Sequence, residues 1–232
     1  MIRRLLLCTA LLTAVSIEAA TTYTFTGNNY NSTRNYSSCT TGADTCASFT
    51  TSMAVSGSFT VPSLIAPGQN NKDISNELTS WSFSDGLSTI SSTDPNARVY
   101  VFAVSTNAGG LILSTNILVE LWQSGSSPHQ AYTDRFAWMR ISATSEEAVY
   151  NDLCVNVGTA PNLLAQPDTC LNDNGISGSY SSQASGSGAW SGGGLATVTP
   201  TLGQWGMICL TLLLLLFALS RLRQVREPSG VA

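Results

Sequence analysis

Apolar and polar residues alternate along much of the chain between Thr21 and Ser179, which is the period-2 pattern of β-strands buried on one face. In the first such segment, Thr21–Thr26, aromatic residues alternate with threonines. In segments such as 98–105 both faces are apolar, which is typical of a central strand. Further strands are predicted at residues 47–61, 81–83, 98–105, 111–113, 116–123 and 136–142.

Turn signals separate these segments, and no long amphipathic helix lies between them. Asp85-Gly86 is typical of a tight hairpin turn, and Glu146–Tyr150 is the one stretch where a short helical turn is expected. Many short strands without intervening helices predict an all-β fold, and we expect an antiparallel β-sandwich ectodomain over residues 21–190.

Residues 177–194 are rich in Ser and Gly, and two interpretations stay open for them. They form either a flexible linker or a last strand from Tyr180 to Trp190 followed by a Gly/Ser linker over residues 191–198. The two aromatic residues favour the strand.

Both ends of the chain carry membrane-targeting patterns. Arg3 and Arg4 precede a short apolar segment, so residues 1–20 are predicted to be a secretory signal peptide that is cleaved after Ala19 or Ala20. A lipoprotein signal that uses Cys8 is a less favoured alternative. Near the other end, residues 202–219 are mostly apolar and would span ~27 Å as a helix, close to the ~30 Å core of a bilayer.

Three arginines follow the apolar segment: Arg221, Arg223 and Arg226. Basic residues beside a spanning helix act as a stop-transfer signal and stay in the cytoplasm. The sequence therefore predicts one C-terminal transmembrane helix, with the ectodomain outside and the C-terminus inside the cell.

The composition narrows the class of the ectodomain. Only 10% of the residues are charged and the formal net charge is −4, while half of the 10 basic residues lie in the two ends. The body is therefore more acidic than the whole chain, and binding to nucleic acid is not expected because phosphates require clustered Lys and Arg.

Four cysteines lie between the two predicted membrane segments, in a compartment that permits disulfides. Local pairing, Cys39 with Cys46 and Cys154 with Cys170, is favoured because each pair encloses a turn-rich segment, although four cysteines allow three pairings. A zinc site is disfavoured because the chain has no Cys-x-x-Cys pair and only one histidine.

Residues for catalysis are few. The only histidine, His129, lies in a segment typical of a loop and is interpreted as a surface residue, and the chain has no Gly-x-Ser-x-Gly motif. Hydrolysis of glycosidic bonds needs two facing carboxylates. Spacing does not show that any two of the available acids face each other: Glu120, Asp134, Glu146, Glu147 and Asp152.

Cys170–Gly175 is similar in composition to a calcium loop but departs from the EF-hand pattern, since Ser181 stands where a bidentate Glu is needed. A looser calcium site at Asp168, Asn172 and Asp173 is a minor alternative. The sequence indicates no catalytic residue, no metal site and no cofactor.

The C-terminal pattern resembles a known sorting domain. The segment from Thr199 to Gly206, the apolar helix and the arginines are similar to the IPTL-CTERM domain, whose typical motif is Ile-Pro-Thr-Leu-x-x-Trp-Gly and which is related to the PEP-CTERM signals of Gram-negative bacteria. The resemblance covers residues 199–226, and Thr199 replaces the usual Ile. The positions that agree with the motif are Pro200, Thr201, Leu202, Trp205 and Gly206.

This resemblance implies a processing route. An exosortase-type membrane protease would recognise the motif while the helix lies in the inner membrane, cleave nearby, and release the body to the cell surface, the medium or the exopolysaccharide matrix. We therefore expect a non-enzymatic, exported surface or matrix protein. The alternative is a carbohydrate-binding module or glycan hydrolase on a β-sandwich, with sugars stacked on Trp81, Trp122 or Trp138.

Overall fold

A computed structural model of the chain describes residues 20–35, 47–174, 179–183, 188–193, 206 and 209–216. The chain divides into two compact units, residues 1–194 and residues 195–232. In chain order, the elements of the first unit are β1 (Thr21–Thr26), β2 (Ser32–Arg34), β3 (Ser56–Val61), β4 (Lys72–Asp73), the 3-10 helix η1 (Ser75–Glu77), β5 (Ser80–Ser84), β6 (Thr89–Ser91), β7 (Ala97–Thr106), β8 (Ile112–Trp122), β9 (Arg135–Ile141), β10 (Glu146–Gly158), β11 (Thr169–Asp173), β12 (Ser179–Gln183) and β13 (Ala189–Ser191).

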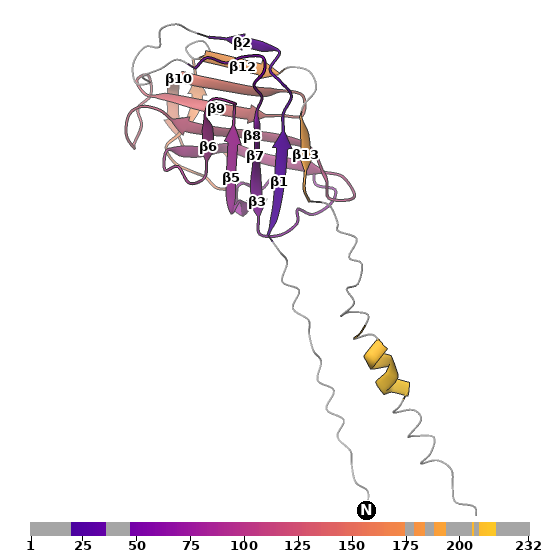
Figure 1. Ribbon diagram of the computed structural model, residues 1–232. Helices are drawn as coiled ribbons and strands as arrows, with labels where there is room; N and C mark the ends of the chain where they lie inside the picture. Colours follow the sequence, from indigo (N-terminus) through magenta and orange to yellow (C-terminus); the bar gives the residue numbers. More distant parts are fainter. Residues whose placement is uncertain are drawn as a thin grey trace, which may run out of the picture. The chain divides into compact units, whose positions relative to one another are not determined.

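These strands form two antiparallel sheets. The smaller has the order β13-β1-β3-β5-β6, and the larger has the order β2-β12-β10-β9-β8-β7-β4, with β11 paired to β10 beside this path. In Figure 1 the strands of the smaller sheet run across those of the larger one. The predicted all-β fold with antiparallel sheets is confirmed.

One hydrophobic core lies between the two sheets and contains side chains from both. Phe59 of β3 and Phe83 of β5 meet Phe102 of β7, with ring centroids 5.0 Å and 6.2 Å apart. Burial of alternate residues in β1 places Tyr23 and Phe25 in this core and leaves the threonines outside. The arrangement fits the predicted β-sandwich.

Close packing within the smaller sheet depends on a glycine. A Cβ added to Gly57 of β3 would lie 2.2 Å from the carbonyl oxygen of Ser82 and 2.5 Å from the ring of Phe83, both on β5. The predicted turn at Asp85-Gly86 joins β5 to β6. The Asp85 carboxylate accepts hydrogen bonds from the backbone amides of Leu87 and Ser88, at 2.8 Å and 2.6 Å.

Three local predictions were wrong. The strand expected over residues 47–61 is formed only from Ser56 onward, because the preceding residues turn to place Phe49 and Val55 in the core. The helical turn expected at Glu146–Tyr150 is instead the start of β10, where each residue pairs with β12 on one side and most also pair with β9. The last strand is two strands, β12 and β13, and they belong to different sheets.

Of the second unit, the structure describes Gly206 and residues 209–216, which are helical. Among the described residues, no helix is long and apolar enough to cross a membrane. Several sequence predictions fall outside the described residues: the signal peptide up to residue 19, Cys39, Cys46, Pro200, Thr201, Leu202, Trp205, Arg221, Arg223 and Arg226.

Candidate functional site

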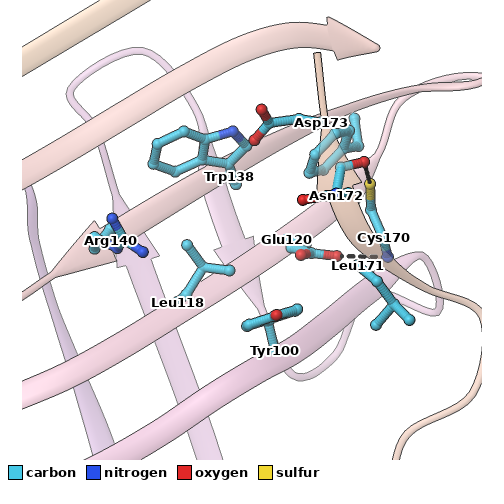
Figure 2. Close-up of a pocket in the computed structure, with 10 residues that line it drawn as sticks. Tyr100, Leu118, Glu120, Trp138, Arg140, Cys170, Leu171, Asn172 and Asp173 are labelled. Atoms are coloured by element: carbon cyan, nitrogen blue, oxygen red, sulfur yellow. Dashed lines mark hydrogen bonds between the residues drawn. The ribbon is translucent and has the colours of Figure 1, made fainter. Parts of the chain in front are cut away.

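A pocket of about 200 Å³ opens on the face of the larger sheet that points away from the core (Figure 2). It combines aromatic, charged and amide side chains, which is the mixture that orients polar ligands. Its lining residues are Tyr100, Leu118, Glu120, Phe136, Trp138, Arg140, Cys170, Leu171, Asn172 and Asp173.

The pairing register of β8 and β9 places the residues that form the floor of the pocket side by side. Glu120 on β8 lies directly opposite Trp138 on β9, and Leu118 lies opposite Arg140 two positions away on the same face. The residues that alternate with these along the strands, such as Val119 and Met139, point into the core. A register shift in β7 between Val99 and Val101 occurs at Tyr100, which also lines the pocket.

The β10–β11 hairpin forms one wall of the pocket by folding over the outer face of the sheet. Its two strands are joined by the Cys154–Cys170 disulfide, which confirms this predicted pairing. Both cysteines are buried with Trp122 and Phe136 in a second, small hydrophobic cluster. The backbone amide of Cys170 donates a hydrogen bond of 3.0 Å to Glu120 Oε2, so the wall is fastened to the floor.

Glu120 is 2% exposed. Burial raises the pKa of the Glu120 carboxyl well above its ordinary value, and Asp173 adds to this, while the hydrogen bond from Cys170 and the charge of Arg98 lower the pKa by less. The carboxyl is therefore protonated at pH values where an exposed glutamate is already ionised, and a protonated carboxyl can donate a hydrogen bond.

Neighbouring groups orient the other polar side chains around the pocket. Trp138 is half-buried, and its Nε1 donates to Asp152 Oδ2 at 3.4 Å, which fixes the edge of the indole on the side of β10. Arg140 is 48% exposed and lies 3.7 Å from the carboxylate of Glu147. An exposed pair of this length contributes little to stability, so the guanidinium is available to a ligand.

A second polar centre surrounds Asp168, and here the interpretation of His129 as a surface residue was wrong. The Asp168 carboxylate accepts hydrogen bonds from the His129 backbone amide at 2.8 Å and from Arg98 at 3.1 Å, and it lies 2.8 Å from His129 Nδ1. The His129 side chain is 1% exposed. Its ring stacks on Trp122 with centroids 4.2 Å apart, and Trp122 Nε1 donates to the Asp168 carbonyl at 2.8 Å.

Burial raises the pKa of Asp168, but hydrogen bonds from the backbone and ring of His129 and from Ser127, together with the charge of His129, outweigh it and lower the pKa below the ordinary value. The Asp–His contact is similar to one half of a hydrolase triad. Trp122 covers the imidazole, however, so a substrate has no access to it. The centre holds the end of β8, the loop at His129 and the start of β11 together.

The tryptophans proposed to bind sugars have different environments. Trp81 is 7% exposed and belongs to the main core, although it borders a second hollow of about 370 Å³ in which Asp94 is the one charged residue. Trp122 is 3% exposed and covered by His129. Of the three, Trp138 presents its ring to the outer pocket.

The acids considered for glycoside hydrolysis have different partners in the structure. Asp134 accepts the Gln130 amide at 2.8 Å, Glu146 accepts the Gly188 amide, and Glu147 pairs with Arg140. A further acid, Asp173, was not among the acids considered for hydrolysis. It lines the same pocket as Glu120.

The loose calcium site is not assembled. Asn172 and Asp173 line the outer pocket, whereas Asp168 is engaged by Arg98 and His129. Within the part of the chain that the structure describes, no group of three or more His, Cys, Asp or Glu residues is placed to hold a metal ion.

The sequence pattern did not indicate Tyr100, Leu118 or Arg140 as site residues. The available signal was the position of Glu120 and Arg140 within the otherwise apolar segments 117–122 and 136–141, where a charged residue requires a partner.

No protein-family model matches this chain, and no curated protein or solved structure is significantly similar to it. The chemistry of the outer pocket is therefore inferred from its geometry.

Proposed function

We propose that this chain is a non-enzymatic, exported surface or extracellular-matrix protein, tethered to the membrane by a C-terminal sorting signal and processed by an exosortase. The observation that carries the proposal is the order of three features within residues 199–226: the motif Pro200-Thr201-Leu202-x-x-Trp205-Gly206, an apolar segment, and the arginines. Each feature alone is common in proteins, but their order within this short segment resembles that of the IPTL-CTERM sorting signals.

The physical chemistry of the C-terminal segment supports a membrane intermediate. The described helical residues 209–216 contain no charged side chain, and a helix extended over residues 202–219 matches the thickness of a bilayer core. The arginines after it hold the C-terminus in the cytoplasm. The ectodomain then lies outside the inner membrane, with the sorting motif near the outer surface where a membrane protease can reach it.

The disulfide between Cys154 and Cys170 supports export, because disulfides form and persist in oxidising compartments such as the periplasm and the cell exterior. A role without catalysis is supported by the closed Asp168 centre, in which His129 is covered.

Cell fractionation tests the sorting proposal. The chain is produced in a Gram-negative strain that carries an exosortase and in the same strain without it, and is detected in the membrane and in the medium. We expect release only with the protease, and loss of release in a Trp205→Ala variant. The matched control is Leu214→Ile, which keeps the hydropathy of the helix. Persistence of the full helix on the mature protein in the strain with the protease would contradict the proposal.

A second candidate function is glycan binding or hydrolysis by the ectodomain. The observation that favours it is the outer pocket, where Trp138 and Tyr100 lie beside Glu120, Arg140 and Asp173. Binding is favoured over hydrolysis, because Glu120 is fastened to the Cys170 amide in a buried position while a catalytic acid must reach the glycosidic oxygen.

A further inference from the structure

We infer that the outer pocket is a subsite for one uncharged sugar ring of an oligosaccharide or polysaccharide. This inference rests on the glycan-binding candidate above and adds to it the site, the charge of the ligand and the residues that recognise it.

The first support is the pair of aromatic side chains. Tyr100 and Trp138 are both half-buried and both line the pocket, and Figure 2 shows them with Glu120 between their strands. Aromatic faces carry partial negative charge, and the C–H groups on the face of a sugar ring carry partial positive charge. A sugar ring therefore gains both apolar burial and electrostatic attraction on such a surface.

The second support is the balance of charge. Arg140 and Asp173 contribute opposite charges to the lining, and Glu120 is buried and accepts a hydrogen bond from the Cys170 amide. Glu147 lies 3.7 Å from Arg140 but outside the lining, so the site has no surplus of positive charge. A lining without surplus positive charge does not specially attract anions, so an uncharged polyhydroxy ligand fits it better than a phosphate or a uronate.

The third support is the set of hydrogen-bonding groups. Arg140 can only donate, Asp173 accepts through its carboxylate, and the Asn172 amide can do both. A sugar hydroxyl is also both a donor and an acceptor, so neighbouring hydroxyls of one ring can be satisfied by this mixed set. The volume of about 200 Å³ suits one ring, while the chain to either side of that ring extends over the surface.

Three contacts hold parts of the site in place before a ligand binds. Glu120 is held by the Cys170 amide, Trp138 by Asp152, and the wall by the Cys154–Cys170 disulfide. Little conformational freedom is then lost on binding, which raises affinity for a given set of contacts.

The test uses the full chain with its disulfide intact, solubilised in a zwitterionic detergent whose head group carries no sugar. The protein is applied to an array of immobilised neutral oligosaccharides built from glucose, galactose, mannose or N-acetylglucosamine, together with an anionic set built from uronic acids. We expect binding to members of the neutral set. Affinity for the best member is then measured by calorimetry.

Variants locate the site. Trp138→Ala should lower the affinity about tenfold or more and Arg140→Ala several-fold, since each removes a contact with one ring. Arg140 is largely exposed, so its variant remains folded even where Trp138→Ala disturbs the sheet. Glu120→Gln keeps an oxygen that accepts the hydrogen bond from the Cys170 amide and should retain binding. The matched control is Tyr132→Ala, which removes an aromatic side chain that is 73% exposed and lies outside the pocket.

The outcomes separate the two levels of the proposal. If no glycan is bound, both the glycan-binding candidate and this subsite are wrong. If a glycan is bound with equal affinity by the Trp138 and Arg140 variants, the candidate function stands and the subsite is wrong. If only the anionic set is bound, the inference that the ligand is uncharged is overturned.

Discussion

The Cys154–Cys170 disulfide is expected to provide much of the stability of the β10–β11 hairpin, and the double variant Cys154→Ala, Cys170→Ala removes it. The two cysteines are 16 positions apart, and closure of a loop of this length stabilises by about 3 kcal/mol through the unfolded chain. Both sulfur atoms also lie in the buried cluster with Trp122 and Phe136, and their loss leaves voids that cost about 1 kcal/mol more. The free energy of unfolding should therefore fall by about 4 kcal/mol.

Equilibrium unfolding in urea at 25 °C, followed by circular dichroism, measures this difference. The dependence of the free energy of unfolding on urea should also steepen, because the unfolded variant is less compact and exposes more surface. Substitution is preferable to a reducing agent, which would also open the predicted Cys39–Cys46 bond. The control is Cys209→Ala, which changes an exposed free cysteine and should alter the free energy of unfolding by less than about 0.5 kcal/mol.

A loss below about 1 kcal/mol, measured in a cooperative two-state transition, would refute this reasoning. It would mean that the hairpin is held by its contacts with Glu120, Arg98 and Trp122 alone, and that the cross-link hardly restricts the unfolded chain.

Three further predictions concern buried groups. His129→Ala should lower the free energy of unfolding at pH 7 by about 2–3 kcal/mol, since Asp168 loses a charge-assisted hydrogen bond. Because the pKa of Asp168 is lowered in the folded state, the wild type should lose this stability as the pH falls below the ordinary value of 3.8. An acid unfolding profile that is the same for the variant and the wild type would contradict the assignment. Glu120→Gln should stabilise the protein relative to the wild type at neutral pH but not at pH 4. A carboxyl whose pKa is raised by folding opposes folding at any pH where that carboxyl is ionised in the unfolded chain. Urea titrations at both pH values check this, and an equal change in the free energy of unfolding at the two would disprove it. Gly57→Ala should lower the thermal midpoint by costing about 2–3 kcal/mol, since its Cβ would meet the Ser82 carbonyl, whereas the control Gly109→Ala, with no contact closer than 3.3 Å, should not.

Much of the fold could be predicted from the chain because one face of most strands is buried. The alternation in Thr21–Thr26 reproduces β1, and the apolar faces of residues 98–105 correspond to the central strand β7. The start of β10 could not be predicted in this way. Glu146 is a polar residue that is fully buried, and the Gly188 amide that partners it lies 42 positions further along the chain.

The candidate site was also harder to predict, because its residues come from segments that lie far apart along the chain. Its floor depends on the register that sets Glu120 opposite Trp138, and its wall depends on how the β10–β11 hairpin folds back over the sheet. The burial of His129 likewise depends on Asp168, 39 positions away. Spacing along the chain carries information about faces of strands, but not about which strand lies beside which.

The most direct test of the proposed export and sorting is the intact mass of the mature protein from a Gram-negative host that carries an exosortase. We expect a chain that begins at Ala20 or Thr21, carries two fewer hydrogens for each disulfide, and ends near the Pro200–Gly206 motif. A mature chain that retains the apolar segment and the arginines at its C-terminus would contradict the account.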